Sequence, residues 1–223
     1  MHRLLLPLAC FLLLTGARPA TAQHQRSDRA GFRLGGSVAQ YRGEDADAGG
    51  SSRLGLCGGL VLHLPVSKAL SVQPEFLFSQ KGASDQPFAL SSTLTARGSQ
   101  RLTYVELPLL VKLRSQVGPF IELGPALGYL LSASADYTAP NGQSATADNA
   151  RNFKRFDWSL AAGLGYQGAK GLLLGLRYHG GLSSVFTAGS YRGVGGEARI
   201  YNQAFQVYAG YIFFGRPQAE FPE

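Results

Sequence analysis

Residues 102–114 read LTYVELPLLVKLR, and this stretch alternates two kinds of side chain from one residue to the next. The odd positions are almost all apolar: Thr103, Val105, Leu107, Leu109, Val111 and Leu113. The even positions include an aromatic residue and three charges: Tyr104, Glu106, Lys112 and Arg114. Successive side chains of a β-strand point to opposite faces, so this period predicts a strand with one apolar and one polar face.

The same alternation recurs over 71–81, 156–166 and 172–179. It fits both a soluble barrel, with its apolar face inside, and a membrane barrel, whose apolar face meets lipid. Many of the 29 glycines fall on the less apolar face, which favours the membrane barrel because small residues suit a narrow interior. Aromatic residues near the predicted strand ends resemble the interfacial girdles of such barrels: Tyr41, Phe78, Tyr104, Phe120, Tyr129, Phe156, Trp158, Tyr166, Tyr178, Phe213 and Phe214.

The connections between the predicted strands alternate in length. We place the strands at 31–41, 53–64, 69–81, 101–114, 117–131, 156–166, 172–183 and 203–214. The long connections are 42–52, 82–100, 132–155 and 184–202, and the short ones are 65–68, 115–116 and 167–171. This alternation is typical of outer-membrane barrels. The sequence therefore predicts an all-β fold, an eight-stranded antiparallel transmembrane β-barrel with short periplasmic turns and longer extracellular loops.

The N-terminus predicts export. After a basic start, residues 4–14 form an apolar run that is too short for a membrane-spanning helix, and ATA at 20–22 resembles a cleavage site. We expect a signal peptide at 1–22, a short periplasmic segment at 23–30, the barrel domain at 31–214 and a tail at 215–223. Cys10 leaves a lipoprotein open, because LAC at 8–10 loosely resembles a lipobox. A soluble periplasmic protein is the alternative that composition alone does not exclude.

Three strands carry a family resemblance. Residues 72–82 (VQPEFLFSQKG), 104–112 (YVELPLLVK) and 118–125 (GPFIELGP) resemble, in this order, strands of the PorT-like outer-membrane β-barrel family. The resemblance covers nearly the whole chain after the signal peptide. It implies a barrel of this type in the cell outer membrane of a Gram-negative bacterium, and most members of the family have no assigned activity.

The charged strand residues point into the lumen if the apolar faces meet lipid. Eight strands leave an interior only wide enough for side chains to fill, and a charge buried there without a partner is strongly destabilising. We therefore predict an ionic network in the lumen, formed by Glu75, Lys81, Glu106, Lys112, Arg114, Glu122, Asp157 and Arg177. Such a network would plug the barrel, and a polar pore or a path for protons or ions is the alternative.

Catalysis and metal binding find little support in the sequence. Outer-membrane lipid A acyltransferases and deacylases need His and Ser near the outer rim, but His63 falls near the periplasmic end and His179 lacks the His-x-Ser spacing of a deacylase. The His and Cys residues fit no metal-site spacing. Removing the two arginines of the signal peptide lowers the net charge from +7 to +5, and dispersed charge of this size does not predict nucleic-acid binding. We predict no enzyme, no catalytic residue and no cofactor.

The expected protein is a non-enzymatic structural or interaction barrel with a plugged polar lumen. A narrow transport pore or an outer-membrane lipid-modifying enzyme is the alternative. The expected partners are outer-membrane lipid, above all lipopolysaccharide, and other envelope or secretion proteins. Arg151, Lys154 and Arg155 in the third long loop are suited to bind lipopolysaccharide phosphates, because arginine binds phosphate in a bidentate manner. A set of solvated loop charges is the alternative here.

Overall fold

Nine strands and one short 3-10 helix make up the described part of this computed structural model, which comprises residues 29–46, 50–89, 95–115, 118–138, 142, 144–191 and 196–213. The elements are β1 (Arg29–Arg42), β2 (Arg53–Pro65), β3 (Leu70–Ala89), β4 (Thr95–Arg114), β5 (Pro119–Thr138), β6 (Ser144–Asp148), η2 (Ala150–Asn152), β7 (Phe156–Gln167), β8 (Leu172–Gly181) and β9 (Tyr201–Ile212). The predicted signal peptide at 1–22, most of the segment at 23–30 and the tail at 215–223 lie outside the described residues.

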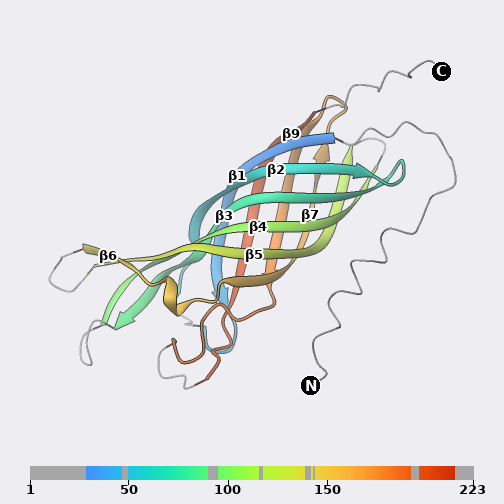
Figure 1. The fold of residues 1–223 in the computed structure, drawn as a ribbon. Coiled ribbons are helices and arrows are strands. Elements are labelled where there is room, and N and C mark those ends of the chain that lie inside the picture. Colours follow the sequence, from blue (N-terminus) through green and yellow to red (C-terminus); the bar gives the residue numbers. More distant parts are fainter. Residues whose placement is uncertain are drawn as a thin grey trace, which may run out of the picture.

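Eight of the nine strands close into a ring (Figure 1). Their order is β4-β3-β2-β1-β9-β8-β7-β5, and β4 also pairs with β5, so this sheet has no free edge around the barrel. Every pairing is antiparallel, and the first strand pairs with the last. The predicted eight-stranded antiparallel barrel is therefore confirmed.

The two ends of the barrel differ in their connections. The short connections 66–69, 115–118 and 168–171 all lie at one end, which we call the turn end. The longer connections lie at the opposite end, which we call the loop end. β1 begins and β9 ends at the turn end, because the number of strands in the ring is even.

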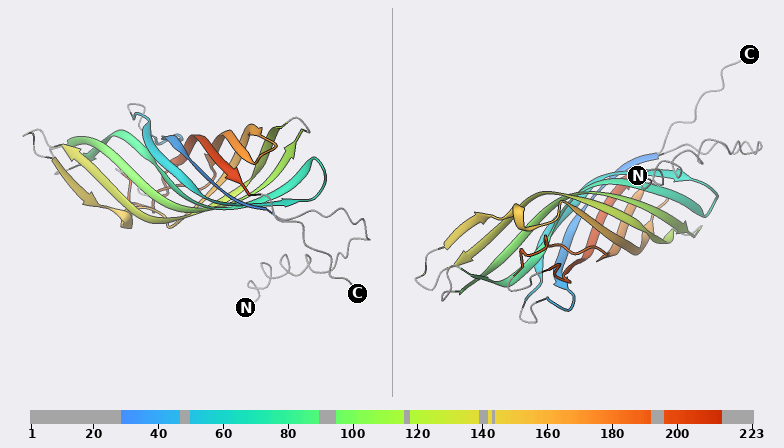
Figure 2. Two further views of the ribbon diagram at one scale, coloured as in Figure 1. Left: turned by 90° about the horizontal axis from the view of Figure 1, so that it is seen from above. Right: turned by 60° about the horizontal axis from the view of Figure 1, so that its bottom comes forward.

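The strands differ in length at the loop end. β3, β4 and β5 each have 20 residues, whereas β7 has 12 and β8 has 10. The longer strands extend beyond the ring, and β6 pairs with the end of β5 (Figures 1 and 2). We call 82–89, 95–101, 132–138 and 144–148 the projecting sheet. The prediction of long loops at 82–100 and 132–155 was thus wrong over these residues.

The physical reason for this difference lies in the sequence of the projecting sheet. Its strands are rich in serine, threonine, alanine and glutamine, for example SATAD in β6. A strand with lipid on one face alternates apolar and polar residues, but a strand that leaves the membrane has no apolar face to maintain. The period of two therefore disappears although the hydrogen-bonded strand continues.

Apolar side chains cover the outer surface of the ring. Large residues that are more than half exposed come from all eight of its strands, among them Leu54, Leu56, Leu60, Phe76, Leu107, Ile121, Trp158, Leu164, Leu176 and Val207. Many inward positions are polar and almost completely buried, with Glu106 1% exposed beside Leu107 at 51%. An apolar surface of this extent is far larger than the patches on soluble monomers, so lipid surrounds the ring.

Exposed aromatic side chains lie near both ends of this apolar surface. At the turn end, the rings of Phe32 and Phe213 are 6.0 Å apart between centroids. Toward the loop end, Tyr129 and Phe156 make an edge-to-face pair at 5.4 Å. These positions suit the two membrane interfaces, where aromatic residues are enriched.

Three aromatic residues that we predicted in the girdles, Tyr41, Tyr104 and Phe120, pack inside the barrel instead, and Phe214 lies outside the described residues. Tyr104 is 1% exposed and Phe120 is 4% exposed. Tyr104 lies on the same face of β4 as Glu106, two residues away, and the alternation of a strand therefore places it inside. Proximity to a strand end was not sufficient to predict contact with lipid.

Candidate functional site

Arg177 on β8 is the centre of one buried ion-pair cluster in the lumen. Its Nη1 and Nη2 donate to the two carboxylate oxygens of Glu75 on β3 at 2.6 and 2.9 Å. Its Nε donates to Oε1 of Glu122 on β5 at 2.7 Å. One guanidinium thus joins carboxylates from two other strands of the ring, and it binds Glu75 in the bidentate geometry that makes such pairs strong.

Arg33 on β1 extends this cluster. Its Nε lies 3.4 Å from Oε2 of Glu75, and its Nη2 donates to Oε1 of Gln206 at 3.1 Å. Its guanidinium carbon lies 4.3 Å from the ring centre of Tyr208, whose hydroxyl donates to Glu122 at 2.9 Å. The sequence prediction missed Arg33, although its place between the outward residues Phe32 and Leu34 is the same signal that identified the other charges.

Lys112 on β4 is linked to this cluster through an amide. Its Nζ donates to Oε1 of Gln73 at 3.3 Å, and Nε2 of Gln73 donates to Glu75 at 2.6 Å. Nζ also donates to Gln167 at 3.0 Å and lies 3.7 Å from the ring centre of Phe120. We call Arg33, Gln73, Glu75, Lys112, Glu122, Arg177 and Tyr208 the turn-end cluster, since they lie in the half of the lumen nearer the turns.

Glycines in the barrel wall make room for these side chains. A Cβ built on Gly175 would lie 2.4 Å from the ring of Tyr208, and one on Gly165 would lie 2.5 Å from the ring of Phe120. A Cβ on Gly163 would lie 2.8 Å from Oε1 of Glu122. The small residues of the inner face therefore allow large aromatic and charged side chains from other strands to fill the lumen.

A second cluster lies nearer the loop end and has Lys81 on β3 at its centre. Its Nζ lies 2.5 Å from Oε1 of Glu106 on β4 and 3.3 Å from Oδ2 of Asp157 on β7. Asn202 on β9 donates to Asp157 at 3.0 Å and to the Tyr104 hydroxyl at 3.3 Å. We call Lys81, Tyr104, Glu106, Asp157 and Asn202 the loop-end cluster.

The two clusters together contain equal numbers of buried acids and bases. The acids are Glu75, Glu106, Glu122 and Asp157, and the bases are Arg33, Lys81, Lys112 and Arg177. Seven of these eight residues belong to the predicted lumen network. The structure does not bring Arg114 into it, because this residue ends β4, is half-buried and makes no ion pair within the described part of the chain. Arg33 supplies the fourth positive charge.

Aromatic residues from the long connections pack over the loop-end cluster. Phe153, before β7, forms a β-bridge with Phe186, after β8, and their ring centres are 4.7 Å apart. Phe186 also contacts Tyr41 and Tyr191, with ring centres at 5.8 and 4.8 Å. We call this buried group the aromatic cap, which consists of Leu102, Tyr104, Leu130, Ala133, Phe153, Val185, Phe186, Ala198 and Ile200 with the partly buried Tyr41 and Tyr191.

A smaller apolar layer lies at the other end of the lumen. It consists of Val61, Phe120, Leu173, Tyr208 and Ile212. It shares Tyr208 with the turn-end cluster, and its Phe120 contacts Lys112, so apolar side chains pack against the charged clusters toward both ends of the lumen. The sequence prediction missed the aromatic cap, because Phe153 and Phe186 stand in connections where no period indicates which side chains turn inward.

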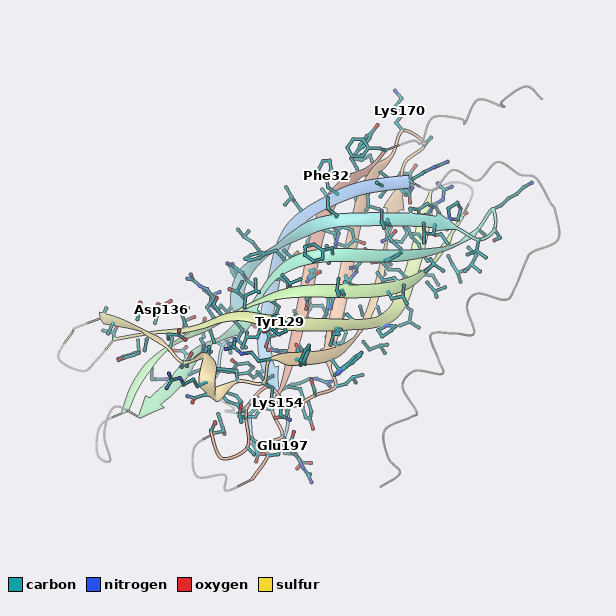
Figure 3. All side chains as sticks on the ribbon, in the orientation of Figure 1. Phe32, Tyr129, Asp136, Lys154, Lys170 and Glu197 are labelled. Atoms are coloured by element: carbon teal, nitrogen blue, oxygen red, sulfur yellow. The ribbon has the colours of Figure 1, made fainter. Side chains whose placement is uncertain are left out.

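The residues predicted to contact lipopolysaccharide lie at the loop end (Figure 3). Arg151 is exposed in η2, and Nη1 of Arg155 donates to the Leu130 carbonyl at 3.3 Å. Lys154 forms an ion pair with Glu197. A surface cavity of about 330 Å³ lies beside this pair and is also lined by Leu182, Arg199 and Tyr201 among others. The structure thus leaves Arg151 and Arg155 more open to an external anion than Lys154.

Neither a metal site nor a spanning helix occurs in the part of the chain that the structure describes. No three His, Cys, Asp or Glu residues in it are grouped so as to hold a metal ion. No helix within the same ranges has the length and apolar character needed to cross a membrane.

Several solved structures of bacterial proteins are similar to this chain. The chain is similar in fold to Ail of Yersinia pestis in complex with the heparin analogue sucrose octasulfate (13% identity, TM-score 0.46, 84% of this chain and 99% of that one). It is also similar to Neisserial surface protein A (12%, 0.43, 82% and 95%) and to OprG of Pseudomonas aeruginosa (16%, 0.42, 86% and 98%). No curated protein matches the chain.

The family model gives the assignment. The model of the outer membrane protein beta-barrel domain matches residues 21–187, which is most of the chain. An outer-membrane barrel needs a closed ring of strands with an apolar outer surface. This chain has both, together with a largely polar interior. The chain belongs to the outer membrane protein beta-barrel domain family and lies in the cell outer membrane.

Proposed function

We propose that this protein is a non-enzymatic structural or interaction barrel of PorT-like type, with a plugged lumen and a contact surface at its loop end. The observation that carries the proposal is the filling of the lumen. Two ion-pair clusters with equal numbers of acids and bases fill the lumen, and an apolar layer packs against them toward each end. An ion would have to displace both layers and break these pairs to pass.

The surroundings of the two strand histidines support a non-enzymatic role. His179 is 1% exposed and points into the lumen, away from lipid substrates. His63 is 6% exposed and lies on β2 near the turn end. An enzyme that acts on lipid needs its catalytic groups at the surface that meets the lipid, and neither histidine is placed there.

Conductance in planar bilayers tests the plugged lumen. We expect the purified protein to give no events or only very small ones. We expect the same of a Phe153→Ala/Phe186→Ala variant, because the ion pairs remain below the opened cap. A heat-modifiable band on SDS gels, faster before boiling than after, serves as the control for a folded barrel. Stable conductance steps from heat-modifiable wild-type protein would support the narrow transport pore instead.

The contact surface is the second part of the proposal. The loop end carries the exposed cations Arg151 and Arg155, and Lys154 beside Glu197. The outer leaflet at this level presents the phosphates of lipopolysaccharide, which guanidinium groups bind through paired hydrogen bonds. We therefore propose lipopolysaccharide as the first partner of this surface.

Co-purification of lipopolysaccharide tests this contact. We expect an Arg151→Gln/Lys154→Gln/Arg155→Gln variant to retain less lipopolysaccharide than wild type and to remain heat-modifiable. A Lys68→Gln/Lys170→Gln variant is the matched control, because it removes positive charge at the turn end (Figure 3). Equal lipopolysaccharide content in the triple variant and the wild type would exclude these residues as the principal site.

A further inference from the structure

Several buried polar atoms between the two clusters have no hydrogen-bond partner in the protein. They come from five strands of the ring: Arg33 Nη1 (β1), Ser79 Oγ (β3), Glu106 Oε2 (β4), both ring nitrogens of His179 (β8), and Asn202 Oδ1 and Gln206 Nε2 (β9). All six residues are at least nine-tenths buried and point inward. We call this set the mid-lumen level.

The position of His179 relates it to Glu106 and Arg33 of this set. Its own strand places it two residues nearer the loop end than Arg177. The charged groups that act on it electrostatically are Glu106 on β4, Lys81 on β3, Arg177 on β8 and Arg33 on β1. His179 therefore lies between the turn-end and loop-end clusters and belongs to neither.

Small side chains lie beside several of these atoms. His179 is flanked on both neighbouring strands by alanine, Ala161 and Ala204. Ser79 has Cys57 on one side and Tyr104 on the other, and Gln206 has Ser37 on one side and Arg177 on the other. The mid-lumen level thus contrasts with the two apolar layers, where aromatic and branched side chains occupy the interior.

The chemistry of the unpaired atoms indicates what occupies this space. Arg33 and Gln206 offer donors, Glu106 and Asn202 offer acceptors, and Ser79 and His179 can do both. A single anion or cation would satisfy only one kind of atom. Buried polar groups in native proteins are nearly always hydrogen-bonded, and a buried water typically makes about three hydrogen bonds to such groups.

We propose that the mid-lumen level is an internal water-binding chamber, in which a cluster of water molecules joins the Glu106 carboxylate to the His179 ring and hydrates Arg33 and Gln206. The aromatic cap separates this water from the outside and the turn-end apolar layer separates it from the periplasm. The proposal of a chamber rests on buried atoms of the barrel wall. It does not depend on the proposed contact with lipopolysaccharide at the loop end.

Water-to-protein NMR transfer in lipid nanodiscs tests the chamber. We expect cross-peaks from water to the His179 ring protons and to the side-chain amide protons of Gln206. A soluble paramagnetic chelate should leave these cross-peaks unchanged. If it quenches them, the water is real but the lumen is open, which contradicts the plugged function and the sealed character of the chamber.

Two variants give the matched comparison. His179→Phe should fill the space and abolish the water cross-peak to Gln206, whereas Tyr178→Phe, on the adjacent outward position, should retain it. If His179→Phe does not fold, the wild-type spectrum decides alone. Absence of cross-peaks to both His179 and Gln206 in folded wild-type protein, or their persistence in His179→Phe, overturns the chamber.

Discussion

The turn-end and loop-end clusters both pair buried carboxylates with cations, but the central cation differs between them. In the turn-end cluster, the guanidinium of Arg177 donates to both oxygens of Glu75 and to Glu122. In the loop-end cluster, the single ammonium of Lys81 is shared between Glu106 and Asp157. A planar guanidinium has five donors in a fixed geometry, whereas an ammonium is a point charge with three.

This difference determines how many direct bonds hold each cluster. Arg177 holds its two acids by direct bonds, and the Tyr208 hydroxyl adds a further bond to Glu122. Both clusters also contain buried atoms without a partner in the protein, namely Oε2 of Glu106 in the loop-end cluster, and Oε2 of Glu122 and Nη1 of Arg33 in the turn-end cluster. The turn-end cluster is thus held by more direct hydrogen bonds around its central cation than the loop-end cluster.

Among the substitutions that test this comparison, replacing Arg177 should lower the free energy of unfolding the most. Arg177→Met leaves two carboxylates buried with weaker partners, and breaking a buried pair in this way costs roughly 3–5 kcal/mol. We expect a loss of this size in the free energy of unfolding, measured in urea and detergent. Leu176→Met, on the lipid face, is the control and should change little. A similar effect of both substitutions would contradict the central place of Arg177.

Replacing Glu106 should have a smaller effect. Glu106→Leu leaves Lys81 buried, but Asp157 still accepts a hydrogen bond from it. Loss of a charged partner under these conditions costs about 2–3 kcal/mol. Leu107→Ala exchanges one apolar contact for another in lipid and should cost less than Glu106→Leu. The reverse order in the same unfolding assay would be incompatible with a lipid-facing Leu107 and a lumen-facing Glu106.

The sequence predicted the ring well because lipid imposes a simple rule. Wherever one face of a strand meets lipid and the other meets the lumen, residues alternate, and this signal indicated four strands of the ring and most of its buried charges. Arg33, between the outward Phe32 and Leu34, carries the same signal and was missed. The ion-pair partners themselves depend on the registers between strands, which a period of two does not contain.

The rule fails where lipid is absent. The projecting sheet is in water on its outer face, and the aromatic cap is made by connections, so neither has a period that reveals it. Tyr104 and Phe120 show a related limit: an aromatic residue near a strand end suits either a girdle or the lumen. Only its position in the alternation distinguishes the two.

Replacing a wall glycine should have the smallest effect and tests why the turn-end cluster is so tightly held. Gly175→Ala would place a methyl group 2.4 Å from the Tyr208 ring and force it to move, which weakens its bond to Glu122. Overpacking of this kind costs about 1 kcal/mol or somewhat more. Gly36→Ala is the matched control, because its Cβ would meet no atom closer than 3.9 Å. We expect the Gly175→Ala barrel to unfold at lower urea concentration than the Gly36→Ala barrel. If Gly175→Ala and Gly36→Ala unfold alike, the wall glycines do not set the packing of Tyr208, and the rigidity of the turn-end cluster comes from Arg177 alone.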